Sequence, residues 1–211
     1  MTALDDTYSA VLEGNAEVAR KGVEACLAAG VIPESILHQG LIPAMREVGA
    51  RFERQEYYVP EMLIAARAMQ AGLNVIRPLL AAGGVQAVAR VAIGTVQGDL
   101  HDIGKNLVAM MLEGAGFEVT DLGTDVQPQK FVEAVRSGAQ LIGISALLTT
   151  TMTKMPAVLE ALKSAGLRDQ ARVIVGGAPL TKEFAEKIGA DGYAPDASQA
   201  VTVSRSLLGL G

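Results

Sequence analysis

The chain has 211 residues, enough for one large domain or two small ones. Its 18 basic and 23 acidic residues give a formal net charge of −5, which argues against a nucleic-acid-binding protein and against attachment to an anionic membrane. No uncharged run is long enough to cross a bilayer, the N-terminus is acidic where a signal peptide would be basic, and the single cysteine, Cys26, excludes an internal disulfide. These features predict a reduced, cytoplasmic protein.

The first part of the chain, up to about Ala82, has helical periodicity in four segments. Asn15 can cap a helix that runs from Ala16 to Ala29. Pro33 occupies a first helical position, and apolar residues follow it at three- and four-residue spacing. Pro60 can open the last helix of this part. We expect a small helical bundle.

The segment Ala81–Ala87, which contains Gly83-Gly84, interrupts the helical pattern and predicts a boundary between a helical cap domain (residues 1–85) and an α/β domain (residues 89–211). Beyond it, short apolar runs alternate with amphipathic segments. The runs, which we interpret as strands covered on both faces, are 91–96, 117–121, 141–145, 172–175 and 192–194. The amphipathic segments, which we interpret as helices, are 103–115, 129–137, 153–165, 181–188 and 197–208. This alternation predicts a flavodoxin-like (Rossmann-type), doubly wound sheet of five parallel strands.

The unusual residues of the α/β half follow three of the predicted strands. Residues 98–104 follow the first strand, residues 145–151 follow the third, and Gly176-Gly177 ends the fourth. Ligands of such sheets bind outside the carboxyl ends of the strands, which for the strand order 2-1-3-4-5 means between strands 1 and 3. All three segments are therefore expected to flank one crevice.

Each of these features also has a simpler structural explanation. Asp99 or Asp102 can cap the following helix, and a single histidine in a loop is more often a surface residue than a ligand. Gly176-Gly177 can serve only as a turn, and Ser or Thr after a strand often satisfies backbone groups. The functional hypothesis depends on their joint placement.

The loop after the first strand indicates a metal site and not a phosphate site. It has neither of the Gly-rich patterns that cradle nucleotide phosphates. It offers one imidazole, His101, beside the carboxylates of Asp99 and Asp102. A neutral imidazole is a good ligand for a transition metal, and a carboxylate on its other nitrogen orients the ring. Since one protein ligand cannot hold a bare ion, the metal would have to arrive within a macrocycle.

The order Asp99-x-His101-x-x-Gly104, then 40 residues to Ser145-x-Leu147, then 28 residues to Gly176-Gly177 resembles the three-part signature of base-off, His-on cobalamin-binding domains. Upstream, residues 52–63 (FERQEYYVPEML) resemble the helical cap of cobalamin-dependent methionine synthase. They are still more similar to the stand-alone corrinoid proteins of methanol, methylamine and methoxyaromatic methyltransferase systems. Those proteins consist of a helical cap and a cobalamin domain, so the resemblance covers nearly the whole chain.

The resemblance implies a role for each matching residue. His101 would replace the dimethylbenzimidazole base of the cofactor as the lower axial ligand of cobalt, with Asp99 and Thr151 as its proton relay. Thr151 stands where methionine synthase has a serine, and a carboxylate that the family often carries near His38 and Gln39 is absent. Further cofactor contacts are implied at Gly98, Leu100, Asp102, Ile103, Gly104, Ser145, Leu147, Thr149, Gly176, Gly177 and Ala197.

Four apolar residues of the first half match the cap that lies over the upper face of the cofactor: Phe52, Val59, Met62 and Leu63. There they would shield a cobalt-bound methyl group from water and oxygen. Ordinary bundle core is the simpler explanation for all four.

The function that the resemblance implies is a methyl carrier. The Co(I) form of the cofactor would accept a methyl group, giving methylcobalamin, from a C1 donor through a donor-specific methyltransferase. A second methyltransferase would pass the methyl group to a thiol or a folate, and a reductive activator protein would be a further partner. The chain would then be one component of an enzyme and not a complete one.

Two alternatives of other classes bind the same cofactor. A cobalamin-responsive sensor or regulator needs an output module such as a DNA-binding helix-turn-helix. The small subunit of an adenosylcobalamin mutase does not usually carry this helical cap. A flavodoxin-like protein without a corrinoid is the remaining alternative, and the three-part motif argues against it.

Overall fold

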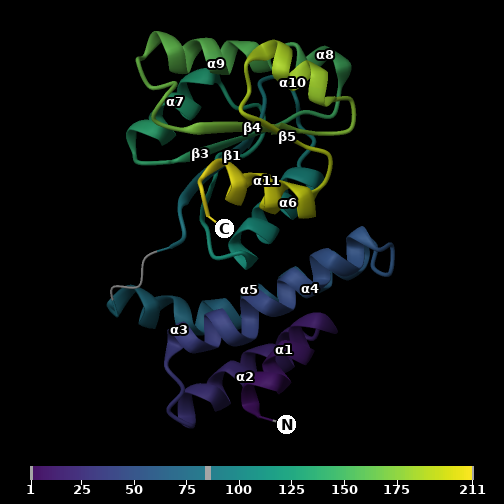
Figure 1. The fold of residues 1–211 in the computed structure, drawn as a ribbon, viewed down its shortest axis with the longest axis vertical. Helices are drawn as coiled ribbons and strands as arrows, with labels where there is room; N and C mark the ends of the chain where they lie inside the picture. The colour runs from purple at the N-terminus through teal and green to yellow at the C-terminus, as the bar shows by residue number, and fades with distance from the viewer. Residues whose placement is uncertain (1, 84–86, 211) are drawn as a thin grey trace. The chain divides into compact units, whose positions relative to one another are not determined.

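The computed structural model describes residues 2–83 and 87–210, which form two compact units (Figure 1). One unit comprises the chain up to Ala87 together with Glu113–Gly116, and the other comprises Val88–Leu112 and the chain from Phe117 onward. Of the expected boundary segment, Ala81 and Ala82 belong to the last helix of the first unit, whereas Gly84 lies outside the described residues. No helix among the described residues has the length and apolar character that crossing a bilayer requires.

The first unit consists of helices, of which α1 and α2 begin at residues whose side chains cap them. Its elements are α1 (Ala3–Leu12), α2 (Ala16–Ala28), α3 (Pro33–Ser35), the π-helical segment η1 (Ile36–Leu41), α4 (Ile42–Glu53) and α5 (Val59–Ala82). Asn15 accepts a hydrogen bond from the N–H of Val18 and caps α2, as predicted. Thr2 and Asp5 form a reciprocal capping box at the start of α1. Fully buried side chains at its centre include Val11, Val23, Cys26 and Leu41.

The helix that begins at Pro33 is irregular. Its segment η1 is π-helical, and the N–H of Ile42 donates to the carbonyl of Leu37, five residues earlier. Pro43 has no amide hydrogen and cannot make the α-helical bond to the carbonyl of Gln39, which accounts for the wider turn at this point. Three- and four-residue spacing of apolar side chains does not reveal such an insertion.

The second unit is built on a five-stranded parallel sheet of order β2-β1-β3-β4-β5, which confirms the predicted topology. Its strands are β1 (Arg90–Thr95), β2 (Glu118–Asp121), β3 (Leu141–Ser145), β4 (Arg172–Gly176) and β5 (Gly192–Ala194). Each predicted strand is present with its ends within one residue of the expected position. The register places Thr95, Ser145, Gly176 and Ala194 in one row across the carboxyl ends of four strands.

Helices cover both faces of this sheet (Figure 1). They are α6 (Ile103–Gly114), α7 (Pro128–Arg136), α8 (Thr149–Met152), α9 (Met155–Ser164), α10 (Lys182–Ile188) and α11 (Ala197–Leu207). Helices α7, α9 and α10 lie on one face, and α6 and α11 lie on the other. The buried cluster under α7 and α9 includes Phe131, Val132, Val158 and Leu162. The architecture is the doubly wound sheet that the alternation of strands and helices predicted.

Two details differ from the sequence-based expectation. Strands β1, β3 and β4 are buried on both faces, but β2 lies at one edge of the sheet, and its residues Glu118, Thr120 and Asp121 are exposed. The helix expected over 153–165 is preceded by the separate short helix α8, so Thr149 and Thr151 belong to a helical turn and not to an open loop.

Candidate functional site

The loops that follow β1 and β3 meet at the carboxyl edge of the sheet, and the carboxylate of Asp99 connects them. Asp99 Oδ2 accepts hydrogen bonds from the N–H of Leu147 at 2.8 Å and from the hydroxyl of Thr151 at 2.6 Å. Asp99 Oδ1 accepts a bond from the N–H of His101 at 3.0 Å. The side chain of Asp99 is 0% exposed. Asp99 is therefore a bridge between two loops and not the cap of α6.

The imidazole of His101 is held by the same carboxylate. Its Nδ1 lies 2.7 Å from Asp99 Oδ1, and 49% of the side chain is exposed. An ionised carboxylate accepts only, so Nδ1 carries the proton and the lone pair of the neutral ring resides on Nε2. Nε2 has no hydrogen-bond partner among the described residues. This is the arrangement of a histidine that binds a metal through Nε2 and is oriented by an outer carboxylate.

The electrostatic environment keeps Asp99 ionised. Burial alone raises the pKa of this carboxyl. The opposing hydrogen bonds from Thr151, from the N–H groups of Leu147 and His101 and from the His101 ring outweigh burial, so the pKa of Asp99 lies below its usual range. Asp99 is thus a permanent acceptor for the imidazole at neutral pH.

The backbone of the loop that carries His101 is also anchored, and two of the anchoring residues were not predicted from the sequence. The buried hydroxyl of Thr95 donates to the carbonyl of His101 at 2.9 Å. The N–H of Gly98 donates to Asp125 Oδ1 at 2.7 Å, and the N–H of Asp125 donates to the carbonyl of Asp99 at 3.0 Å. Asp125 has a φ of +52°, which is uncommon for a residue other than glycine. The position of Asp125 shortly after β2 could have predicted its place near the His101 loop, because the carboxyl ends of β2 and β1 lie on the same side of the sheet.

The other predicted contact residues of this unit lie around His101 or along the same edge. Leu100 and Ile103 are 73% and 71% exposed, large values for apolar side chains. Leu147 and Thr149 are exposed after β3, Ser145 is half-buried at the end of β3, and Asp102 precedes α6. Ala197 is buried at the start of α11, further along the edge. Contacts of these residues with a cofactor stay predictions.

The glycines of the motif divide into two kinds. A Cβ at Gly177, whose φ is +130°, would lie 1.8 Å from the carbonyl oxygen of Ala146, and one at Gly176 would lie 2.9 Å from the carbonyl oxygen of Ala194. Both positions therefore need glycine for the packing of the chain itself. A Cβ at Gly104, in the first turn of α6, would meet nothing within 4 Å. The fold does not require glycine at that position, so glycine there leaves room for another molecule.

These observations fit a metal that is bound within a flat organic ring. One histidine nitrogen is available as a ligand, the apolar side chains of Leu100 and Ile103 lie exposed on either side of it in the chain, and Gly104 leaves space beside it. Apolar side chains cover a macrocycle favourably, since their burial removes them from water.

The residues expected to cap the cofactor lie around the turn between α4 and α5 in the helical unit. Met62 is buried, Phe52 and Leu63 are half-buried, and Val59 is exposed at the start of α5. Their contact with a cofactor stays a prediction.

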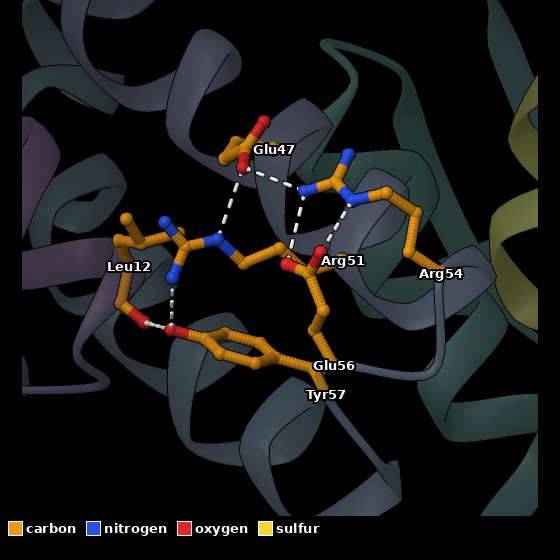
Figure 2. Close-up of polar contacts among 6 residues, drawn as sticks. All are labelled: Leu12, Glu47, Arg51, Arg54, Glu56 and Tyr57. Atoms are coloured by element: carbon orange, nitrogen blue, oxygen red, sulfur yellow. Dashed lines mark hydrogen bonds and ion pairs between the residues drawn. The ribbon is translucent and has the colours of Figure 1, made fainter.

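A polar network holds the α4–α5 turn (Figure 2). Glu47 Oε1 accepts from Arg51 Nε at 3.0 Å and from Arg54 Nη2 at 3.1 Å. The hydroxyl of Tyr57 donates to the carbonyl of Leu12 at 3.1 Å, and the guanidinium of Arg51 lies 5.1 Å from the centre of the Tyr57 ring. The network joins the end of α4 to the end of α1.

Comparison with known proteins decides the family. Residues 89–202 and residues 3–77 each match a family described as B12 binding domain. The chain belongs to the B12-binding family. Cobalamin is its cofactor, as the sequence motif implied.

Relatives of this B12-binding protein are similar over nearly their whole length. It is 44% identical to dimethylamine corrinoid protein 3 of Methanosarcina acetivorans, with 97% of this chain and 96% of the relative covered. It is 43% identical to trimethylamine corrinoid protein 1 of the same organism, with 94% of each chain covered.

Two solved structures share the architecture. A cobalamin-binding protein from Desulfitobacterium hafniense is 30% identical, with a TM-score of 0.78 and with 96% of this chain and 97% of that chain covered. A chain of the methanol:cobalamin methyltransferase complex from Methanosarcina barkeri is 25% identical, with a TM-score of 0.87 and with 98% of this chain and 80% of that chain covered. These matches confirm the helical cap and the five-stranded parallel sheet as one known combination.

Proposed function

We propose that this B12-binding protein carries methyl groups between a donor-specific methyltransferase and a second methyltransferase with a thiol or folate acceptor. The observation that supports this most is the oriented imidazole of His101, whose Nε2 is available while Nδ1 is held by buried Asp99. The names of relatives that are more than 40% identical, dimethylamine and trimethylamine corrinoid proteins, support a methylated amine as the donor. A reductive activator protein is a further proposed partner.

The residues of the site have separable tasks in this proposal. The cobalt of the cofactor, when bound, would supply the chemistry of accepting and releasing a methyl group. His101 would hold the cofactor through Nε2 in place of the cofactor's own base. Asp99 orients the ring through Nδ1, and Thr151 donates to the other carboxylate oxygen, which holds the carboxylate in place.

The same three residues could hold a proton whenever the imidazole is not bound to the cofactor. Nε2 would then be open to a proton, and the adjacent carboxylate of Asp99 would compensate the resulting positive charge. Thr151 keeps one lone pair of Asp99 occupied, so the carboxylate does not turn away from the ring. With Nε2 bound to the cofactor, the ring would keep its single proton on Nδ1, where Asp99 accepts it.

The test of the lower ligand is electron paramagnetic resonance of the Co(II) form. The protein is loaded with cobalamin whose benzimidazole nitrogens carry ¹⁵N. We expect splitting from one axial nitrogen that the label leaves unchanged and that His101→Ala abolishes. His38→Ala, a change of the other histidine, is the matched control and should keep the splitting. Splitting that responds to the label would show that the cofactor retains its own base.

The test of the carrier function is methyl transfer in solution. The reduced, corrinoid-loaded protein is mixed with a methylamine methyltransferase and its methylated amine, and the visible spectrum is followed. We expect the spectrum of the methylated cofactor to develop only when both are present, and to develop slowly with His101→Ala. A protein that binds cobalamin but is never methylated by such an enzyme would contradict the proposed donor class.

A further inference from the structure

Lys105 is a buried cation at an unusual position. It lies in the first turn of α6, and only 2% of it is exposed. A positive charge in the first turn of a helix is repelled by the helix dipole, and burial of a charge costs free energy unless the charge is paired. Formation of α6 therefore does not explain Lys105, and its partners must.

The partners of Lys105 connect the edge strand to the neighbourhood of His101. Lys105 Nζ donates to Asp121 Oδ2 at 2.5 Å and to Asn106 Oδ1 at 2.6 Å. Asn106 Nδ2 donates in turn to Asp102 Oδ2 at 3.1 Å. Asp121 is the last residue of β2, and Asp102 directly follows His101. A continuous chain of polar contacts thus runs from the end of β2 to the residue next to the histidine.

This chain lies on the opposite side of the His101 loop from the bonds of Asp99. Asp99 connects the loop to the segment after β3, whereas Lys105 and Asp125 connect it to β2 and the segment after β2. Strands β2 and β3 flank β1 on its two sides. The loop is therefore fastened on both sides. On the β2 side, one of the links is a charge pair of which only the cation is buried, since 47% of the Asp121 side chain is exposed.

We propose that Lys105, with Asp121 as its counter-ion, is a positioning residue for His101. The pair fixes the first turn of α6 against β2 and, through Asn106, fixes Asp102. The loop then holds Nε2 of the imidazole at a fixed position at the carboxyl edge of the sheet. The inference rests on the proposed role of His101 as the lower ligand, and it adds residues that the cobalamin motif itself does not contain.

The experiment compares two carboxylates on the same strand. Asp121→Asn removes the counter-ion of Lys105. Glu118→Gln is the matched control, because Glu118 lies at the opposite end of β2 and pairs with Arg90 of β1 at 3.2 Å. Each variant is loaded with cobalamin, and the nitrogen-split and unsplit fractions of the Co(II) resonance are measured. The corrinoid dissociation constant and the melting temperature of the corrinoid-free protein are measured for the same variants.

We expect Asp121→Asn to lower the ratio of nitrogen-split to unsplit signal by about 10-fold. This is the lower end of the effect of substituting residues that contact a metal ligand but not the metal. Lys105→Met should give a similar shift, and the double variant should be no worse than either single variant, because both changes break one interaction. Glu118→Gln should keep the wild-type ratio. Asp121→Glu, which keeps a carboxylate at this position, should retain most of the nitrogen-split signal that Asp121→Asn loses.

The outcomes separate this inference from the proposed function. If wild-type protein shows no splitting from a protein nitrogen, the role of His101 itself is wrong. If wild type shows the splitting and Asp121→Asn only lowers the melting temperature, the pair is structural and the positioning role is overturned. If Asp121→Asn does not fold, Lys105→Met decides by the same measurement, since it leaves no buried charge without a partner.

Discussion

Replacement of Asp99 by asparagine is the sharpest perturbation of the site, because the shape of the side chain is kept. Oδ1 accepts from the N–H and the ring of His101, and Oδ2 accepts from the N–H of Leu147 and the hydroxyl of Thr151. Both ends of the carboxylate therefore face donors. The amide NH₂ of asparagine must meet at least one of these donors in either orientation.

The magnitude follows from those contacts. A hydrogen bond to a charged group contributes about 1.5–3 kcal/mol, and a buried donor left without an acceptor costs about 1–3 kcal/mol. Asp99→Asn should thus lower the stability of the α/β unit by about 3–5 kcal/mol. Thr151→Val removes one donor and leaves the carboxylate its other partners, so it should cost about 1–2 kcal/mol. At roughly 4 °C per kcal/mol, the melting temperatures of the two variants should differ clearly.

Calorimetry of the corrinoid-free protein measures these differences without any contribution from the cofactor. The helical unit serves as an internal reference, since neither substitution lies in it. A melting temperature for Asp99→Asn equal to that of wild type at pH 7 would refute the reasoning, because it would mean that the bonds to Asp99 contribute nothing to the loop.

The pH dependence of the stability is an independent check that Asp99 stabilises the fold as an ionised carboxylate. The pKa of Asp99 is lower in the folded protein than its usual value, so the carboxylate stabilises the fold fully above the unfolded pKa of about 3.9 and progressively less as pH falls toward the folded pKa. The difference in melting temperature between wild type and Asp99→Asn should narrow as the pH falls below about 4. A difference that widens below about pH 4 would contradict the assignment of Asp99 as an ionised acceptor.

Three further predictions concern other parts of the chain. Tyr57→Phe removes the hydroxyl that bonds Leu12 and should lower the stability of the helical unit by about 1–2 kcal/mol in calorimetry; an unchanged value would show that the network is inert. Phe52→Ala should leave the protein folded and make the methylcobalamin-loaded form more sensitive to light; a lower melting temperature with wild-type photolysis would assign Phe52 to the bundle core. Gly177→Ala should destabilise the corrinoid-free protein, whereas Gly104→Ala should fold normally and bind corrinoid more weakly; the prediction for Gly104 fails if titration gives the wild-type dissociation constant.

The order of the sheet and the edge at which the site lies could be predicted because both follow from backbone geometry. Parallel strands place all their carboxyl ends at one edge, so residues after β1 and β3 had to meet there. The pairing of Asp99 with His101 was implied by the family resemblance, and the structure shows that one carboxylate oxygen accepts from both the ring and the backbone N–H of His101.

The burial of individual side chains and the closest distances between atoms could not be predicted in this way. Lys105 reads in the sequence as an ordinary charged residue near a helix start, and only the structure shows that it is buried against Asp121. The resemblance implies a cofactor contact at Gly177, but only the structure shows that the chain itself also needs glycine there, since a Cβ would lie 1.8 Å from the carbonyl oxygen of Ala146. The sequence feature that could have drawn attention to Lys105 is its positive charge, since a cation in the first turn of a helix is electrostatically unfavourable.

The way in which His101 is held matches what a repeatedly exchanging ligand requires. Its backbone is fastened through its carbonyl to Thr95 and through its N–H to Asp99, so the loop does not need to move. Within the described part of the chain, the ring makes a single hydrogen bond, through Nδ1, and about half of the side chain is exposed. Rotation of an exposed side chain takes picoseconds to nanoseconds, whereas loop motions take nanoseconds to microseconds. In the proposed carrier, detachment and return of the imidazole would then be a side-chain rotation about a fixed backbone, with Asp99 as the point to which the ring returns.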